Sequence, residues 1–212
     1  MKALIAAILI CLLMSFRQQT ETTLPSSPLS IYSSAWNDPK YLSCNTAAKA
    51  NYLTSEEKEL IYILNLARTN PKLFANTVIK KYPDISGRLY LRYIDYYTSL
   101  LDTMKKIKPL KLLRPDSLNY ISAFCHAVKS GEVAYVGHIR TDDECRKKTK
   151  YSGECCQYGF SKPIDIIMGL LIDEGVPSLG HRDICLSSYI KIGVSIQPHK
   201  GYGYNAVLDF GY

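Results

Sequence analysis

The sequence lacks the short motifs that identify the commonest metal sites and hydrolases. None of its seven cysteines forms a C-x-x-C pair, which argues against a closed, cysteine-rich zinc site. It contains neither the H-E-x-x-H pair of zinc proteases nor the G-x-S-x-G stretch of serine hydrolases. Histidine occurs only four times. Catalysis therefore has none of its usual signatures in this chain.

Only one stretch of the chain is apolar over a long distance. After Met1 and Lys2, an apolar run extends from Ala3 to Phe16, shorter than the roughly 20 residues that span a bilayer. We interpret residues 1–16 as a signal peptide and expect no transmembrane segment after its removal. Cys11 follows leucine and isoleucine rather than small residues, which disfavours a lipoprotein anchor. The sequence thus predicts a secreted or periplasmic protein.

Removal of that leader would leave an even number of cysteines in a chain addressed to an oxidising compartment. We therefore expect disulfides. The sequence leaves the connectivity open, although a bond between the neighbours Cys155 and Cys156 would be strained. The cysteines concerned are Cys44, Cys125, Cys145, Cys155, Cys156 and Cys185.

Positive charge is in modest excess. The 26 basic and 19 acidic residues give a formal net charge of +7. Basic residues gather at 105–114 and 140–150, but no aromatic-and-glycine recognition motif accompanies them. We interpret both clusters as solvated faces and expect no nucleic-acid partner.

Composition predicts one folded domain behind an N-terminal extension. Residues 17–51 are interpreted as a linker and extension, because residues 17–37 are rich in serine, threonine and proline and show no hydrophobic period. Residues 52–212 are long enough for one domain with its own core.

Helices are predicted through most of that domain. Thr54 and Glu57 form a capping box at the start of the first helix, and Asn70 with Pro71 starts the second. Further helices are expected over residues 87–106, from about 116 to 131, and over 161–175. The fourth carries an apolar stripe of Leu118, Ile121, Phe124, Cys125 and Val128.

Strands are predicted at the end of the chain. Residues 189–198, "YIKIGVSIQP", alternate apolar side chains on one face, and "NAVLDFGY" follows as an antiparallel partner. Helices in a run followed by strands in a run favour an α+β fold, in which helices cover both sides of a small antiparallel sheet.

Three polar residues each follow a glycine: His138, Glu154 and His181. A glycine lets the backbone turn sharply or approach closely, so the next side chain can be directed into a cleft. Asp173 lies eight residues before His181, at the end of the fifth predicted helix. We expect the chain to turn back there and to bring Asp173 and His181 together, with Glu174 as the second choice.

Residues 173–196, "DEGVPSLGHRDICLSSYIKIGVSI", resemble the signature of the CAP superfamily in its bacterial, SCP-like form. That superfamily includes cysteine-rich secretory proteins, antigen 5 and pathogenesis-related proteins. "LTSEEKELIYILNLARTNP" is similar to its opening helix, with Asn65 and Arg68 at positions where members commonly have these residues. "GECC" stands where many members have Gly-Glu-Asn. The resemblance covers about residues 52–212.

The resemblance implies a three-layer α-β-α sandwich with a central cavity lined by two histidines and two acidic residues. Matching by motif assigns these to His138, Glu154, Asp173 and His181. The sequence departs from the pattern around His138, which reads "GHIRTDD", and Asp173 stands where glutamate is frequent. Cys155 and Cys185 also differ from the usual residues, which would fit local disulfides. The only tryptophan, Trp36, falls in the expected linker.

Such a cavity would suit a divalent metal such as Zn²⁺, with His138 and His181 as ligands and the carboxylates as a third ligand or as ring-orienting groups. Without a metal, the carboxylates would favour protonated imidazoles, one of which could act as a general acid or base. His126 and His199 are interpreted as structural or solvated.

Three functions remain open at this level. The first is a binding module for a lipid, glycan or peptide in the extracellular or periplasmic space. The second is a metal-dependent hydrolase or protease that uses His138, His181 and Glu154. The third is a protein-interaction module that uses its helical surface. All three remain open because fold alone does not choose a ligand.

Overall fold

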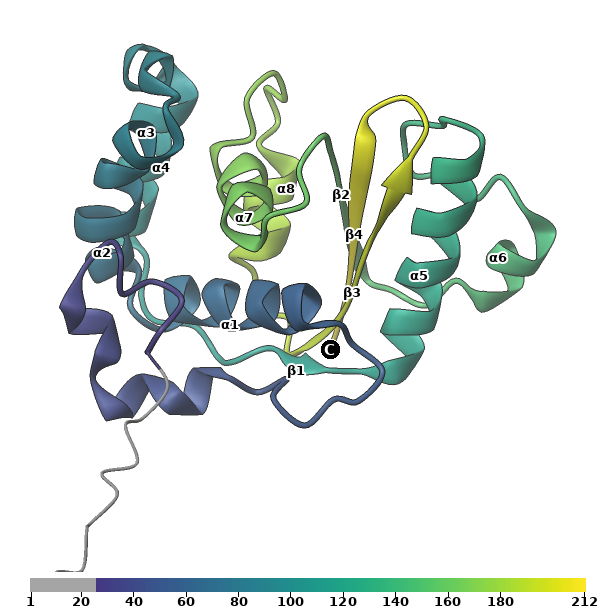
Figure 1. Ribbon diagram of the computed structural model, residues 1–212, viewed down its shortest axis with the longest axis horizontal. Coiled ribbons are helices and arrows are strands. Elements are labelled where there is room, and N and C mark those ends of the chain that lie inside the picture. The colour runs from purple at the N-terminus through teal and green to yellow at the C-terminus, as the bar shows by residue number, and fades with distance from the viewer. Residues whose placement is uncertain (1–25) are drawn as a thin grey trace, which may run out of the picture.

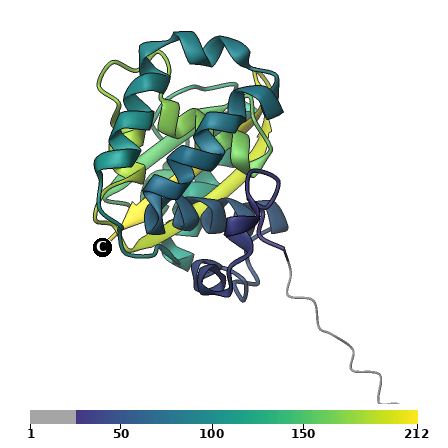
Figure 2. The same cartoon turned by 90° about the vertical axis from the view of Figure 1, so that its left-hand side faces the viewer.

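The computed structural model describes residues 26–212. The predicted signal peptide, Cys11 and the first part of the expected linker lie outside the described residues. The fold is α+β, as predicted, with helices on both sides of a small sheet (Figure 1). On one side lie α5 and α6, and on the other lie α1, α7 and α8, with α2 to α4 further out. Figure 2 shows the helices of this second side in front of the strands.

The elements have the following bounds. The helices are α1 (Ser55–Thr69), α2 (Pro71–Phe74), α3 (Lys80–Ser86), α4 (Asp95–Lys106), α5 (Ser117–Glu132), α6 (Asp143–Lys148), α7 (Pro163–Ile172) and α8 (Gly180–Cys185). Short 3-10 helices are η1 (Ser34–Asn37), η2 (Pro39–Cys44) and η4 (Leu89–Tyr93), and η3 (Ala75–Ile79) is a short π-helix. The strands are β1 (Arg114–Pro115), β2 (Gly153–Tyr158), β3 (Lys191–His199) and β4 (Gly203–Gly211).

The sheet has the order β1-β3-β4-β2. The predicted hairpin is confirmed: β3 and β4 are antiparallel, with Val194 opposite Leu208. Two strands were not predicted. β2 pairs antiparallel with β4, and the two-residue β1 pairs parallel with β3, so the sheet is mixed rather than wholly antiparallel.

The predicted starts of the first two helices are confirmed, whereas the helix expected over residues 87–106 begins only at Asp95, after the 3-10 helix η4. Thr54 Oγ1 accepts a hydrogen bond from the backbone N–H of Glu57, and the Glu57 carboxylate accepts from the N–H of Thr54. Glu57 also accepts from the backbone N–H of Ile196 at 3.0 Å, so the cap of α1 is tied to β3. Within the described residues, no helix is long and apolar enough to cross a membrane.

The expected linker is wrong for its described part. From Ser27 onward the chain folds against the core, and Leu29 and Trp36 are fully buried there. Trp36 packs beside Tyr41 and Phe74, and its indole N–H donates to Thr77 Oγ1 at 3.0 Å. The apolar side chains scattered among serine and proline supply this contact without any regular period. Residues 27–51 therefore share one core with residues 52–212.

Helix α5 turns its apolar stripe outward, although such a stripe usually faces a core. Leu118, Ile121 and Phe124 are exposed at 57%, 43% and 42%. The buried face carries small or polar residues, including Ser122, Ala123, His126, Ala127 and Ser130. The side chain of Asn205 on β4 donates to Ser130 and to the Ala127 carbonyl. Helix α5 thus packs against the sheet through a thin layer of small and partly polar side chains.

Two glycines permit this close approach. A Cβ atom at Gly193 on β3 would lie 2.0 Å from the backbone nitrogen of Tyr120, and one at Gly131 would lie 2.1 Å from the Pro198 carbonyl oxygen. Both neighbours are backbone atoms, which cannot rotate away as side chains do.

Replacement of Gly193 by alanine should therefore push α5 away from β3 and destabilise the protein by at least about 1–3 kcal/mol, the usual effect of overpacking. Urea denaturation gives the change in the free energy of unfolding. Gly169→Ala in α7 is the matched control, because its Cβ would only reach ordinary contact with side chains at 3.4 Å or more. Equal stability of both variants would contradict the close packing described here.

The prediction of disulfides is confirmed for one pair only. Cys125 on α5 is bonded to Cys145 on α6. Cys44, Cys155, Cys156 and Cys185 are free and buried, so the expected local bonds of Cys155 and Cys185 are wrong in this structure. Cys155 and Cys185 lie in the apolar core. Burial, and to a smaller extent the neighbouring Cys185 thiol, raise the pKa of Cys155 well above its ordinary value.

Candidate functional site

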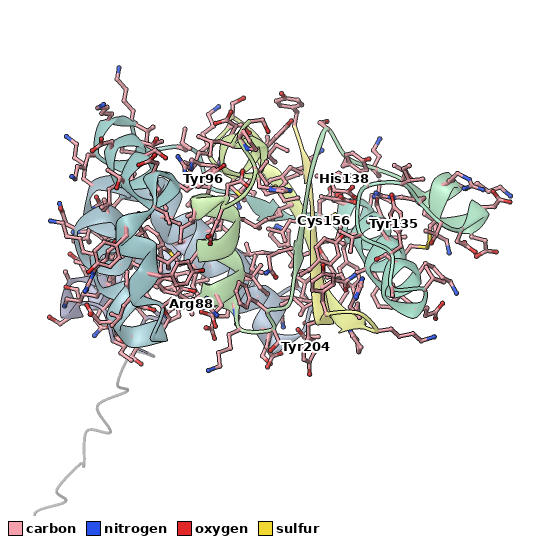
Figure 3. The ribbon with its side chains drawn as sticks, turned by 90° about the horizontal axis from the view of Figure 1, so that it is seen from above. Arg88, Tyr96, Tyr135, His138, Cys156 and Tyr204 are labelled. Carbon is pink, nitrogen blue, oxygen red and sulfur yellow. A yellow bond between two sulfur atoms is a disulfide. The ribbon has the colours of Figure 1, made fainter. Side chains whose placement is uncertain are left out.

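The four residues predicted from the sequence come from four different segments. His138 lies in the loop between α5 and α6, Glu154 on β2, Asp173 at the C-cap of α7, and His181 in the first turn of α8. Figure 3 shows His138 beside the strands, close to Cys156. The structure brings all four together as two histidine–carboxylate pairs that face each other.

The first pair is Asp173 with His181. Asp173 adopts the left-handed conformation at φ 59°, which commonly ends a helix and which aspartate tolerates better than most non-glycine residues. Its carboxylate accepts from His181 Nδ1 at 2.7 Å and from the backbone N–H groups of His181 and Arg182 at 2.9 and 3.3 Å. The carboxylate therefore fixes both the imidazole and the first turn of α8.

Arg182 stabilises the position of the Asp173–His181 pair. Its side chain is buried and donates to the carbonyls of Leu171 and Ile172 at the end of α7, at 2.6 and 2.8 Å. It also donates to Ser99 Oγ and to the Tyr96 carbonyl on α4. Gly180, His181 and Arg182 form the first turn of the short helix α8, which this arginine anchors.

The second pair is Glu154 with His138. His138 Nδ1 donates to Glu154 Oε1 at 2.8 Å, and Arg140 forms an ion pair with Glu154 Oε2 at 2.5 Å. The hydrogen bond from Glu154 raises the pKa of His138, which outweighs the opposite effects of burial and of Arg140. Burial raises the pKa of Glu154, but the bond to His138 and the charge of Arg140 more than compensate and lower it overall.

The glycines before these residues act in different ways. Gly137 has φ 133°, a conformation open mainly to glycine, and this turns His138 towards β2. Gly153 is required by packing instead, because a Cβ there would meet the ring of Tyr189 at 2.8 Å. Gly180 has open space around it, with only the Ser178 hydroxyl within reach, so its Cα hydrogen is not required for His181.

The two imidazoles lie side by side with their ring centroids 6.3 Å apart and their planes tilted by 35°. The carboxylate side chains are only 2% exposed, whereas the His138 side chain is 53% and the His181 side chain 21% exposed. Each buried carboxylate thus holds a solvent-accessible imidazole. The four residues line none of five pockets on the described residues, the largest of about 430 Å³ between the N-terminal segment and α1. Both imidazoles are thus accessible to solvent, and the central cavity stays a prediction.

A third carboxyl group lies behind Glu154. Asp209 on β4 is fully buried, and Arg140 contacts it at 3.4 Å while also pairing with Glu154. Burial, followed by the negative charge of Glu154, raises the pKa of Asp209 from 3.8 to about 9. One guanidinium thus serves two buried carboxyl groups, and Asp209 holds a proton at neutral pH.

Asp209→Asn should flatten the pH dependence of stability. A carboxyl group that binds its proton more tightly in the folded state makes the free energy of unfolding fall as pH rises, here between about 4 and 9, by up to about 1.4 kcal/mol per pH unit. Asparagine keeps the shape and cannot lose that proton. Denaturation at a series of pH values measures the slope, with Asp102→Asn on exposed α4 as the control for the substitution. An unchanged slope in Asp209→Asn would contradict a protonated Asp209.

The sequence analysis missed two neighbours of this site, His126 and Cys156. Ligand atoms of His126, Glu154 and Cys156 all lie within 4.8 Å of one another, and all three residues are buried. The described residues thus contain a histidine–glutamate–cysteine group that could hold a metal ion. A signal was present: Glu154 and Cys156 are two residues apart on one strand and therefore share a face. Cys125 and Cys145 also lie near Asp142, but their sulfurs are used in the disulfide.

The other histidine predicted to be structural is confirmed in that role. His199 is buried at the turn of the β3–β4 hairpin. Its Nδ1 accepts from the backbone N–H groups of Gly201 and Tyr202, and its Nε2 donates to the Tyr135 carbonyl. His199 thus stabilises the turn through Nδ1 and ties it to the segment after α5 through Nε2.

Comparisons with protein-family models, with curated proteins and with solved structures found no match to this chain. Its function must therefore be argued from the geometry of the site.

Proposed function

We propose that this protein is a CAP-type ligand-binding or interaction module that works in the extracellular or periplasmic space. The observation that carries the proposal is the pair of accessible imidazoles, each held by a buried carboxylate, that face each other at a ring distance of 6.3 Å. The α-β-α layering and the position of the Gly-His-Arg segment just before the Ile-Gly-Val strand support the family assignment. The Cys125–Cys145 disulfide supports export to an oxidising compartment.

The hydrogen bonds leave one nitrogen of each ring for a ligand. Nδ1 of both rings is bonded to a carboxylate, and within residues 26–212 no hydrogen bond involves Nε2 of His138 or His181. The raised pKa of His138 increases the fraction of this ring that is protonated near neutral pH. Two Nε2 positions on one patch would bind the polar end of a lipid, glycan or peptide.

The same contacts favour binding over hydrolysis. A general base must have a free oxygen within reach of a water molecule. Glu154 Oε1 accepts from His138, and Glu154 Oε2 forms an ion pair with Arg140 and is buried without a hydrogen bond. Asp173 uses both oxygens for His181 and the backbone of α8. Both carboxylates are nearly inaccessible, so neither can activate water without rearrangement.

A metal-dependent hydrolase or protease is the second candidate, because the donor set fits Zn²⁺. A ring whose Nδ1–H bonds to a carboxylate has its Nε2 oriented for a metal, as in carboxylate–histidine–zinc arrangements. His138 and His181 would hold the ion through Nε2, while Glu154 and Asp173 would fix the tautomers. When bound, the ion would supply Lewis acidity and lower the pKa of a coordinated water.

Binding to lipid and glycan arrays tests the proposal. The wild type should bind a defined class of ligand, and His138→Gln/His181→Gln should weaken that binding at least tenfold. Lys72→Gln, at an exposed position on α2, is the control and should bind as the wild type does. Binding that survives the double substitution would place the ligand on another surface, as expected of a protein-interaction module.

Zinc calorimetry separates the two candidates. A heat of Zn²⁺ binding in the micromolar range or tighter that disappears in His181→Gln supports the hydrolase. Absence of any heat that depends on His181 argues against it.

A further inference from the structure

His126 presents an unpartnered nitrogen to the interior of the protein. It lies on the inner face of α5 and is 1% exposed. Its Nε2 lies 2.9 Å from the carbonyl oxygen of Gly137, which can only accept, so Nε2 must carry the proton. Nδ1 is then a bare lone pair, and this buried atom has no hydrogen-bond partner in the structure. An unpaired buried polar atom of this kind requires an explanation.

Two potential metal-ligating groups lie beside the His126 ring. Cys156 Sγ and a Glu154 carboxylate oxygen lie within 4.8 Å of one ring nitrogen of His126 and of each other. Ligand atoms of one tetrahedral Zn²⁺, with bonds of about 2.0–2.3 Å, lie about 3.5 Å apart. The three ligand atoms would therefore have to move about 1 Å closer together to bind one ion. The bond of His126 Nε2–H to a backbone carbonyl is the usual support of a metal-binding histidine.

A cation at this cluster would be balanced by two groups. Glu154 supplies a buried carboxylate, which pairs with the single guanidinium of Arg140. Cys156 supplies a thiol that loses its proton when it binds a metal as the thiolate. A set of one sulfur, one nitrogen and one oxygen suits Zn²⁺ and not the hard cations Mg²⁺ or Ca²⁺, which prefer oxygen ligands.

We propose that His126, Glu154 and Cys156 form a buried Zn²⁺ site between α5 and β2, behind the ring of His138. The site shares Glu154 with the accessible patch but uses neither Asp173 nor His181. It therefore goes beyond the proposed ligand binding and beyond a metal held between His138 and His181. Cys156 Sγ lies 3.7 Å from His138 Nδ1, so the site adjoins the patch directly.

Cobalt titration of the chelator-stripped full-length chain tests the proposal. A thiolate ligand gives Co²⁺ an intense sulfur-to-metal charge-transfer band, which a site of imidazoles and carboxylates does not produce. We expect one equivalent of Co²⁺ to produce the band and Zn²⁺ to abolish it. Cys156→Ser should remove the band, and His126→Gln should weaken Co²⁺ binding at least tenfold. Cys44→Ser, at another free buried cysteine, and His181→Gln should leave the band unchanged.

Absence of the band in the wild type, or its persistence in Cys156→Ser, would overturn the proposal. If Cys156→Ser does not fold, X-ray absorption spectroscopy of the Zn²⁺-loaded wild type shows whether sulfur is a ligand of the ion. One sulfur neighbour at about 2.3 Å supports the site, and a shell of nitrogen and oxygen alone overturns it. The unchanged band in His181→Gln keeps this result separate from the tests of the accessible patch.

Discussion

Replacement of Arg68 by alanine should destabilise the protein by at least about 3 kcal/mol, because it leaves several buried acceptors unpaired at about 1–3 kcal/mol each. The Arg68 side chain is fully buried on α1. It donates to the carbonyls of Cys185, Ser187 and Tyr189 at 2.7–2.9 Å and to that of Lys111 at 3.0–3.2 Å. These bonds hold the segment between α8 and β3, and so they fix the helix that carries His181.

Lysine should not rescue this position, because a single ammonium group cannot reproduce the planar fork that reaches four carbonyls. Urea denaturation of Arg68→Ala and Arg68→Lys measures both effects. Arg92→Ala provides the matched control, since Arg92 forms only a solvent-exposed ion pair with Asp84 and its loss should change stability by less than about 1 kcal/mol. Equal stability of the Arg68 and Arg92 variants would contradict the account of the α8–β3 segment.

Replacement of Arg140 by methionine should have an effect of similar size, about 3–5 kcal/mol, because it leaves the buried Glu154 carboxylate without its cationic partner, while the neighbouring Asp209 is already protonated at neutral pH. Methionine retains most of the side-chain volume, so the loss is chiefly electrostatic. Removal of Arg140 also removes a charge that lowers the pKa of His138, and that pKa should rise further. Urea denaturation at pH 7 and NMR titration of His138 are the two measurements.

A second substitution identifies the cause of that loss. Arg140→Met/Glu154→Gln should recover part of the stability, because the carboxylate that Arg140→Met leaves without a cationic partner is then replaced by a neutral amide. No recovery in the double variant, or full stability of Arg140→Met alone, would show that the buried charges do not depend on this arginine.

Local signals in the sequence were sufficient for most helices and for the final hairpin. The capping box of Thr54 and Glu57, the Asn70–Pro71 start and the alternation along residues 189–198 depend on neighbouring residues only. The pairing of Asp173 with His181 was also predictable, because the end of a helix and only seven intervening residues limit where the chain can go.

Features that depend on tertiary packing were not predicted. β2 has buried residues at nearly every position, so its sequence "GECCQY" shows no alternation. α5 buries its small and polar face because Gly131 and Gly193 allow it to approach the sheet closely, and its apolar stripe gave the opposite indication. His126 was interpreted as structural or solvated. Its free Nδ1 lone pair could not be predicted, because it follows from the contact of Nε2 with the distant Gly137 carbonyl.

The most direct test of the central claim is a nuclear Overhauser measurement between the imidazole rings of His138 and His181 in the folded protein. The chain has only four histidines, so selective labelling gives a simple spectrum. Rings with centroids 6.3 Å apart should show a cross-peak between their carbon-bound protons. That cross-peak should vanish in both His138→Gln and His181→Gln. Two assigned rings with no cross-peak between them would mean that the histidines do not share one site.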